Sequence, residues 1–297
     1  MKKYRLKGHE TFAIREGWLN KGLYEVNKNP LVFKENYGSD ALGVGSNMAK
    51  AIRFWLKAAN LTVEKKDGVY LSEMGKIILQ SDPYFEDYFS LWIVHCNIVM
   101  NKEMVTSWNL FFNEFEEARF DREDIAEFIK RRIEIEYEAE SISERSIRDD
   151  VSVLINMYLK SKEDIDPEDK KSSPFAEFGL LKRDVNAIQK ARPNRQTLNE
   201  YVILYCICEY IDENKGISIE DILNKSNMPG KILGINRIML NEYLDILSYK
   251  GELYVNHTAG LDMVWRSSSR WSVLSGSPRS ARCSGSGWNR FRRFCSL

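Results

Sequence analysis

The chain has 297 residues, of which 43% are hydrophobic, and its 43 basic and 43 acidic side chains give a formal net charge of zero. This length and composition predict about two or three small domains with packed cores. No apolar run is long enough to span a membrane, and no apolar signal segment follows Lys2 and Lys3. We therefore expect a cytoplasmic protein that does not contact a membrane.

The charge is distributed unevenly along the sequence. Residues 266 to 297 contain seven arginines, no lysine and no acid, so this segment carries +7 and the preceding residues carry −7. The composition also changes abruptly there to Ser, Arg, Gly and Trp. We interpret this segment as a disordered or frame-shifted tail without function. A genuine basic arm that binds nucleic acid is the alternative.

Polar and aromatic side chains are unusually dense near the N-terminus. His9 and Glu10 are followed directly by Thr11 and Phe12, and Arg15 comes shortly afterwards. A histidine and a carboxylate can act as a general base and a metal ligand, and an arginine can hold a phosphate. His9, Glu10 and Arg15 are therefore candidate catalytic residues. The alternative is a hydrogen-bonded clasp that packs the N-terminus against the first helix, because a lone histidine is more often structural than catalytic.

The first amphipathic helix carries a basic face. Short helices are expected at 17 to 26 and 39 to 42, and a longer one from Ser46, as N-cap after a glycine-rich turn, to about Ala59. Apolar side chains recur on one face of the longer helix at three- and four-residue spacing, namely Met48, Ala51, Ile52, Trp55, Leu56 and Ala59. The opposite face carries Asn47, Lys50, Arg53 and Lys57.

A β-hairpin is predicted directly after this helix. Residues 61 to 71 alternate apolar and polar side chains around an Asp-Gly turn, and Ser72 caps the next helix. This order of elements indicates a winged helix-turn-helix, which lays a helix along double-stranded DNA. The predicted DNA contacts are Asn47, Lys50, Arg53, Lys57, Lys65 and Lys66. The alternative is an ordinary solvated helix face, because basic surface stripes are common.

The middle of the chain is predicted to be helical. Residues 84 to 99 and 108 to 115 are too apolar all round for surface helices and indicate a central packing unit. Two further helices are expected from 121 to 132 and, after Ser143 as N-cap, from 144 to 159.

These last two helices resemble a second helix-turn-helix, which has no obvious wing. Arg145 and Arg148 lie off the centre of the apolar stripe and are predicted to face DNA. The neighbouring acids Asp149 and Asp150 would oppose phosphate, so the case for DNA contact is weaker here.

The charged, apolar-poor segment from 160 to 173 is the clearest linker. Beyond it, three helices and two strands repeat the helix–turn–helix–wing pattern. The predicted fold is therefore mainly α with small β-hairpin wings, in tandem winged helix-turn-helix-like units. The predicted parts are an N-terminal winged-helix domain, a central helical domain, a linker, a C-terminal winged-helix-like domain and a tail, at 1–82, 83–159, 160–173, 174–265 and 266–297.

Common catalytic and metal-binding motifs are not found in the sequence. The histidines lack metal-ligand spacing, no Cys-x-x-Cys pair occurs, and the Gly-Val-Gly-Ser turn lacks the lysine of a P-loop. The sequence therefore predicts no zinc site, no disulfide framework and no nucleotide hydrolysis.

Several longer segments resemble a bacterial family whose function is not known. They are HETFAIREGWLNKG at 9–22, ALGVGSNMAKAIRFWLKAANL at 41–61, LSEMGKIIL at 71–79, FFNEF at 111–115, SERSIRDDVSVLINMYL at 143–159, SPFAEFGLL at 173–181 and HTAGLDMV at 257–264. Members of the family lie in DNA phosphorothioation and antiphage defence gene clusters, and the chain resembles the B subunit of Ssp-type systems. The resemblance is expected to end at Val264, where the tail begins.

This resemblance implies a DNA-facing role beside a cysteine desulfurase, an ATP pyrophosphatase and an ATPase. We therefore expect a component of a phosphorothioation antiphage system that binds double-stranded DNA. One alternative is a Mg²⁺-dependent nicking endonuclease of that system, because a member of the Ssp type is thought to nick DNA so that sulfur can be inserted. Its candidate residues would be His9, Glu10 and Arg15. The other alternative is a winged-helix transcriptional regulator or a non-enzymatic scaffold.

Overall fold

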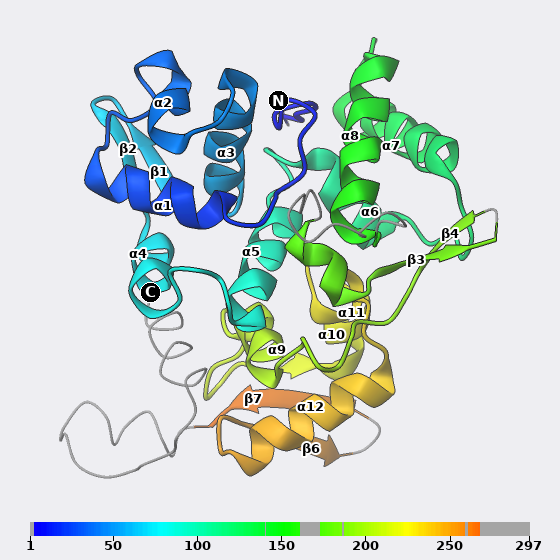
Figure 1. The fold of residues 1–297 in the computed structure, drawn as a ribbon. Helices are drawn as coiled ribbons and strands as arrows, with labels where there is room; N and C mark the ends of the chain where they lie inside the picture. The colour runs from blue at the N-terminus through cyan, green and yellow to red at the C-terminus, as the bar shows by residue number, and fades with distance from the viewer. Residues whose placement is uncertain (1–2, 140, 161–172, 186, 259–260, 268–297) are drawn as a thin grey trace, which may run out of the picture. The chain divides into compact units, whose positions relative to one another are not determined.

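The computed structural model describes residues 3–139, 141–160, 173–185, 187–258 and 261–267. It divides the chain into two compact units, Met1–Thr197 and Leu198–Leu297 (Figure 1). The sequence predicts more parts than these two units. The boundary between the units lies after Thr197, whereas the predicted linker is at 160 to 173. Nearly all of that linker and of the tail at 266 to 297 lies outside the described residues.

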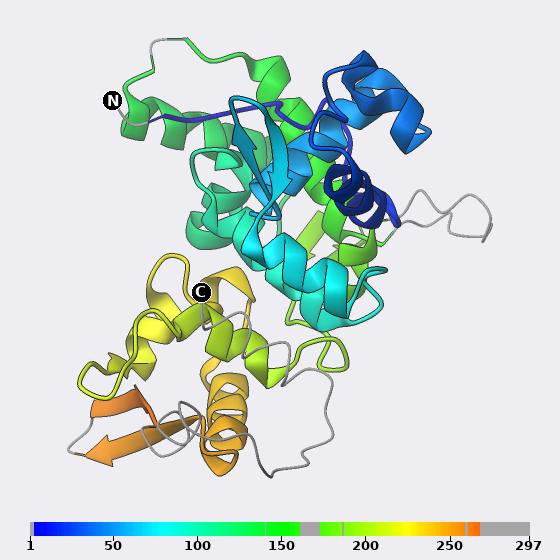
Figure 2. The same ribbon diagram turned by 90° about the vertical axis from the view of Figure 1, so that its left-hand side faces the viewer.

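The first unit begins with helices and a hairpin in the predicted order. These elements are α1 (Trp18–Lys28), η1 (Asn36–Gly38), α2 (Ser39–Leu42), α3 (Ser46–Ala58), β1 (Thr62–Lys65), β2 (Gly68–Leu71) and α4 (Glu73–Ser81). Both ribbon views place the antiparallel β1–β2 hairpin near α1 and α3, and residues of β2 and β1 contact these two helices (Figures 1 and 2). The prediction of a mainly helical chain with small antiparallel hairpins is confirmed.

Helix α3 packs through its apolar side chains, and its N-cap lies one residue before the predicted one. Gly45, and not Ser46, is the N-cap residue, because Ser46 already has helical geometry. Trp55 is fully buried, and its indole N–H donates to the carbonyl of Phe12 at 2.9 Å. Leu61, just before β1, lies close to α4, where a Cβ added to Gly75 would lie 2.1 Å from the carbonyl oxygen of Leu61. Glycine at position 75 therefore permits this close approach.

Two apolar helices form the centre of the first unit, as the sequence predicts. They are α5 (Tyr88–Met100) and α6 (Thr106–Glu114), and most of their side chains are buried. His95 on α5 is fully buried, and its Nδ1 lies 2.8 Å from the hydroxyl of Tyr158. Burial raises the pKa of the Tyr158 hydroxyl well above its usual value. His95 and Tyr158 therefore belong to the packed core.

The remaining elements of the first unit surround this centre. They are α7 (Arg122–Tyr137), α8 (Glu144–Tyr158), η2 (Pro174–Phe178), β3 (Leu181–Asp184) and β4 (Ala187–Lys190). The Ser143 side chain accepts the backbone N–H of Ser146, which confirms the predicted N-cap of α8. Phe120 and Ile188 exchange two backbone hydrogen bonds, of 3.0 and 2.8 Å, so the β3–β4 hairpin is joined to the start of α7.

The second unit combines helices with a three-stranded sheet. Its elements are α9 (Glu200–Ile207), β5 (Ile217–Ser218), α10 (Ile219–Asn224), α11 (Pro229–Ile232), α12 (Arg237–Tyr249), β6 (Leu253–Thr258) and β7 (Leu261–Arg266). The strand order is β5-β7-β6, with both pairs antiparallel, and α12 contacts α9 and β6. In the part of the chain that the structure describes, no helix is long and apolar enough to cross a membrane.

Candidate nucleic-acid interface

The predicted basic face of α3 is open to solvent. Asn47 is exposed, and Lys50, Arg53 and Lys57 are partly exposed, while the residues between them are largely buried. The Lys50 ammonium lies 4.3 Å from the centre of the Tyr37 ring and 3.4 Å from the side-chain oxygen of Asn47. The structure therefore brings the four predicted side chains of α3 together on one surface.

A carboxylate of the hairpin partly neutralises this surface. Glu64 on β1 accepts from Arg53 at 2.9 Å and from Lys57 at 2.6 Å. Burial raises the pKa of the Glu64 carboxyl, but the hydrogen bond from Lys57 and the charges of both cations outweigh this effect and leave the pKa below its usual value. Glu64 is thus a negative charge held between two of the predicted DNA contacts, which the helical spacing of α3 alone does not reveal.

The hairpin tip adds two more cations. Lys65 and Lys66 are both exposed, and the ammonium of Lys65 lies 5.0 Å from the centre of the Tyr70 ring. Asp67 accepts a hydrogen bond of 2.8 Å from the Tyr70 hydroxyl. From residue 46 to 71 the charged side chains are five cations and two carboxylates, so the surface keeps a positive balance. We call α3 and this hairpin tip the α3 surface.

The two arginines predicted on α8 differ in their surroundings. Arg145 is exposed, whereas Arg148 forms an ion pair of 3.2 Å with Glu123 on α7. We expected the acids that follow them, Asp149 and Asp150, to oppose a phosphate. Both carboxylates are instead engaged within the protein. Asp149 pairs with the Lys7 ammonium at 2.7 Å, and Asp150 is 2% exposed and turned into the protein.

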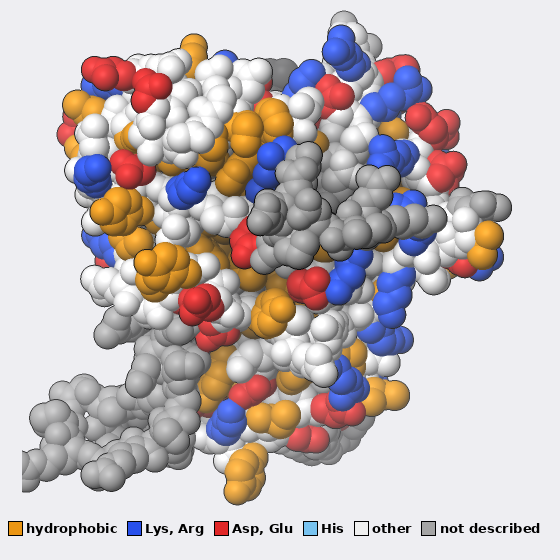
Figure 3. Space-filling view, in the orientation of Figure 1, with side chains coloured by type: hydrophobic (Ala, Val, Ile, Leu, Met, Phe, Trp, Pro, Cys, Tyr) orange, Lys and Arg blue, Asp and Glu red, His pale blue; other side chains and the backbone are white. Residues whose placement is uncertain are grey.

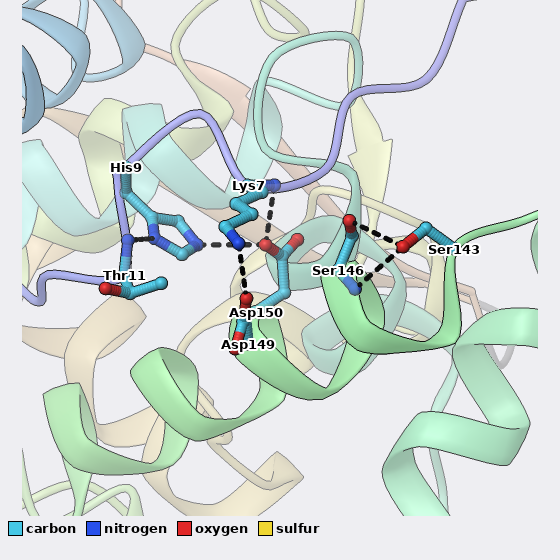
Figure 4. A network of polar contacts seen from close by, with 7 residues as sticks. All are labelled: Lys7, His9, Thr11, Ser143, Ser146, Asp149 and Asp150. Carbon is cyan, nitrogen blue, oxygen red and sulfur yellow. Dashed lines mark hydrogen bonds and ion pairs between the residues drawn. The ribbon is translucent and has the colours of Figure 1, made fainter.

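Asp150 is the centre of a buried polar network (Figure 4). One of its oxygens lies 3.0 Å from His9 Nε2 and accepts the backbone N–H of Lys7 at 2.7 Å, and the other accepts the hydroxyl of Ser107 at 2.6 Å. The His9 ring is 1% exposed and stacks on Trp55, with 5.6 Å between ring centres. We call this network the N-terminal clasp, because it joins residues 7 to 9 to α3, α6 and α8.

The geometry of the clasp fixes the tautomer of His9. Its Nδ1 accepts the backbone N–H of Thr11 at 3.2 Å, so the proton of the neutral ring is on Nε2, which faces Asp150. Both ring nitrogens are therefore engaged, and the ring is shielded from solvent. This position does not support the predicted catalytic role of His9. The sequence alternative of a clasp describes it better, although the partners are α3, α6 and α8 instead of the first helix.

The backbone of the clasp is unusual. Lys7, Glu10 and Thr11 have φ values of 57°, 50° and 69°, a left-handed conformation that L-residues rarely adopt. A Cβ added to Gly8 would lie 2.2 Å from the ring of Phe54, so a glycine is needed between Lys7 and His9. The His9 segment packs on the buried side of α3, through Phe54 and Trp55, and leaves Lys50 and Arg53 on the open side.

The other two candidate catalytic residues lie outside the network. Glu10 is partly exposed, and Arg15 lies over the rings of Phe12 and Trp18, with 5.6 and 5.5 Å from its guanidinium carbon to the ring centres. Within the described ranges, no three His, Cys, Asp or Glu side chains converge as metal ligands. Glu10, the carboxylate considered as a metal ligand, is therefore not part of such a group in the described ranges.

Sequence reasoning missed a group of cations on the first unit. Lys182 and Arg183 on β3, and Arg192 just after β4, are exposed. Lys and Arg side chains also gather along the edge formed by α7, α8 and the β3–β4 hairpin (Figure 3). The sequence does not predict this group of cations, because its members are far apart in the chain. They come together only because the contact between Phe120 and Ile188 joins the β3–β4 hairpin to the start of α7.

Helix α12 of the second unit offers a different surface. Its exposed side chains include Ile238 and Tyr249, 65% and 94% exposed, and also Glu242 and Asp245. Its Arg237 pairs with Glu220 and lies 3.7 Å from Asp262. An apolar and acidic helix face of this kind does not attract phosphate. The α3 surface is the better candidate for nucleic acid.

Two crystal structures share this fold over most of their length. One is described as "SspB crystal structure", with a TM-score of 0.79, 26% identity, and coverage of 90% of this chain and 85% of that chain. The other is described as "Magnesium ion-bound SspB crystal structure", with a TM-score of 0.80, 24% identity, and coverage of 98% and 97%. No curated protein matches the sequence.

The sequence also matches one protein family over nearly its whole length. The family is described as "Protein of unknown function (DUF4007)", and the match covers residues 6–276. It runs past Val264, where we expected the resemblance to end, so the first part of the predicted tail belongs to the family sequence. The fold, the motifs and this match together place the chain in the DUF4007 family.

Proposed function

We propose that this chain is a DNA-binding component of a DNA phosphorothioation system. The likeness to SspB and membership of the DUF4007 family support the system, and the α3 surface supports the role. The observation that carries the proposal is the open face of α3, where Asn47, Lys50, Arg53 and Lys57 project together beside a hairpin with two exposed lysines.

The α3 surface suits the grooved, negative surface of duplex DNA. A helix of 13 residues is about 20 Å long, enough to follow a major groove for several base pairs. Arg53 and Asn47 have the side chains that read base edges, while Lys50, Lys65 and Lys66 suit phosphates. DNA phosphates would take the place of Glu64 beside Arg53 and Lys57, so binding requires the exchange of two ion pairs.

Replacing two cations of α3 tests the proposal. We expect Lys50→Ala/Arg53→Ala to weaken binding to a short duplex at least about tenfold, and to flatten the slope of log K against log salt by about 1–2, because fewer counterions are released. Fluorescence anisotropy over a range of salt concentrations measures both quantities.

The matched control removes two exposed lysines of the second unit, in Lys215→Ala/Lys225→Ala. It lowers the net charge by the same amount and should leave both the affinity and the slope nearly unchanged. Equal losses in the two double variants would show that only total charge matters, and would contradict a specific role of the α3 surface.

A DNA-nicking activity is the second candidate function. The observation that favours it is the magnesium ion in one of the similar structures, together with the partly exposed Glu10 and Arg15. A supercoiled plasmid incubated with and without Mg²⁺ tests for the activity. If nicking requires Mg²⁺ but persists in Glu10→Ala and Arg15→Ala, the activity stands and these residues do not perform it.

A scaffold role is favoured by the open face of α12. Its isoleucines and Tyr249, beside Glu242 and Asp245, suit a basic segment of a partner protein by charge complementarity. A cysteine desulfurase, an ATP pyrophosphatase and an ATPase are the partners we propose. Co-purification with one of them in the absence of any DNA affinity would favour the scaffold over the DNA-binding component.

A further inference from the structure

A cavity beside the start of α1 is not explained by the α3 surface or by the clasp. Its volume is about 420 Å³, and Arg15, Asn20, Tyr84, Tyr88 and Ser173 are among the residues that line it. They come from the first turns of α1, the segment before α5 and the start of η2, all within the first unit. This volume accommodates one nucleotide.

One wall of the cavity holds a buried hydrogen-bonding group, the hydroxyl of Ser173, that lacks a partner in the described ranges. The hydroxyl of Ser173 is buried, with the residue 4% exposed, and no hydrogen-bond partner is found for it among the described residues. A buried hydroxyl without a hydrogen-bond partner destabilises the folded chain, and a ligand that forms the hydrogen bond removes this cost. Ser173 lines the cavity, so a polar ligand that reaches its hydroxyl from there would supply the missing partner.

A second wall is suited to an anion. Helix α1 starts after Gly17, which supplies no side-chain cap, and its first turn carries no acidic residue. Gly17 and Asn20 both line the cavity, so the first turn of α1 presents its N-terminal, partly positive end there. Arg15 is held over two aromatic rings, and the structure gives it no carboxylate partner among the described residues.

Aromatic side chains form the open side of the cavity. Tyr84 is 71% exposed and Tyr88 is 38% exposed, although burying either ring would be favourable. Exposed aromatic rings beside an arginine are the arrangement with which proteins stack the bases of single-stranded nucleic acid. The ligand that fits these groups has a flat ring and an anionic group.

The acids in the lining narrow the class of ligand. Glu16, Glu86 and Glu177 also line the cavity, and Glu177 pairs with Lys160 at 2.9 Å. These carboxylates oppose a triphosphate but tolerate the single negative charge of a phosphodiester. They also accept hydrogen bonds from the amino groups of guanine, adenine and cytosine, which thymine lacks.

We propose that this cavity holds a single nucleotide that has left the base stack of bound DNA. Its base stacks on Tyr84, the more exposed of the two rings, its phosphate lies against Arg15 and the first turn of α1, and its polar edge faces Ser173. A guanine, adenine or cytosine is preferred over thymine because of the carboxylates. This inference rests on the proposed DNA-binding function and adds to it a site for an unstacked base.

Binding to a duplex with one unpaired guanine tests this site. Fluorescence anisotropy compares that duplex with a fully paired duplex of the same length, using the full chain. We expect about tenfold tighter binding to the duplex with the unpaired guanine, because stacking of one base on an aromatic ring contributes that much. Tyr84→Ala should abolish this preference without changing the affinity for the paired duplex, and Tyr84→Phe should retain it.

Tyr24→Ala is the matched control, because Tyr24 is an exposed tyrosine of α1 that does not line the cavity. It should keep the preference for the unpaired guanine. Equal binding of the two duplexes by the unmodified chain, or a preference that survives Tyr84→Ala, would overturn the nucleotide site and leave the proposed function standing. Binding of neither duplex would overturn both.

Discussion

Asp150→Ala is expected to lower the free energy of unfolding by about 3–5 kcal/mol, because it leaves buried groups without their partner. The substitution removes the acceptor of the His9 ring, the Lys7 backbone N–H and the Ser107 hydroxyl at once. For a unit of this size each kcal/mol corresponds to about 2–4 °C in Tm, so a loss of roughly 10 °C is expected. Thermal and denaturant unfolding followed by circular dichroism measure the effect.

Asp149→Ala is the control for this prediction. Asp149 is the preceding residue and also an acid, but its ion pair with Lys7 is partly exposed to solvent. Its loss should therefore cost at most about 1 kcal/mol. Asp150→Asn, which keeps the shape and one acceptor oxygen, should fall between the two. Similar stabilities of Asp149→Ala and Asp150→Ala would show that the buried network does not hold the N-terminal segment in place.

Glu64→Gln is expected to tighten binding to duplex DNA by roughly tenfold at low salt. The substitution releases Arg53 and Lys57 from the carboxylate, so phosphates no longer compete with it. The slope of log K against log salt should also become steeper by about 1–2, because the two cations then release counterions on binding. An anisotropy titration at several salt concentrations measures the affinity and the slope together.

The gain in DNA affinity from Glu64→Gln is expected across the usual pH range. Because its pKa is lowered, the carboxylate of the folded protein stays ionised as the pH falls below the usual pKa of 4.5, and its ion pairs are lost only at lower pH. Glu220→Gln is the control, since it frees Arg237 in the second unit from a similar exposed ion pair. A rise in affinity of the same size in both variants would mean that Glu64 does not act at the DNA surface.

The sequence predicted best what depends on local spacing. The open face of α3 follows from residues three and four apart, and the N-cap at Ser143 follows from a single serine before a helix. The β1–β2 hairpin follows from an Asp-Gly turn between alternating residues. These features need no knowledge of the tertiary fold.

The missed features depend on contacts between distant residues. His9 meets Asp150 across 141 positions, and neither residue gives a sign of the other in the sequence. The sequence alone therefore allows His9 to be a general base or part of a clasp, and the structure shows its ring buried with both nitrogens engaged. The contacts of Glu64 with Arg53 and Lys57 give no signal in the sequence either, because only the packing of β1 against α3 brings these residues together.

The clasp and the α3 surface are connected through α3 itself. Trp55 packs against His9 on the buried side of the helix, and Arg53, two residues earlier, projects on the open side. The clasp therefore fixes the helix from which the proposed DNA contacts project. A damaged clasp would reduce DNA binding through the position of α3, and not through lost contacts with DNA.

Photo-crosslinking from α3 tests the central claim most directly. A benzoylphenylalanine is placed at position 47 on α3 or at position 238 on α12, both of them exposed and near the start of a 13-residue helix. After irradiation with a labelled duplex, we expect covalent protein–DNA product from position 47 and none from position 238. Product from position 238 with none from position 47 would contradict the assignment of the α3 surface as the DNA interface.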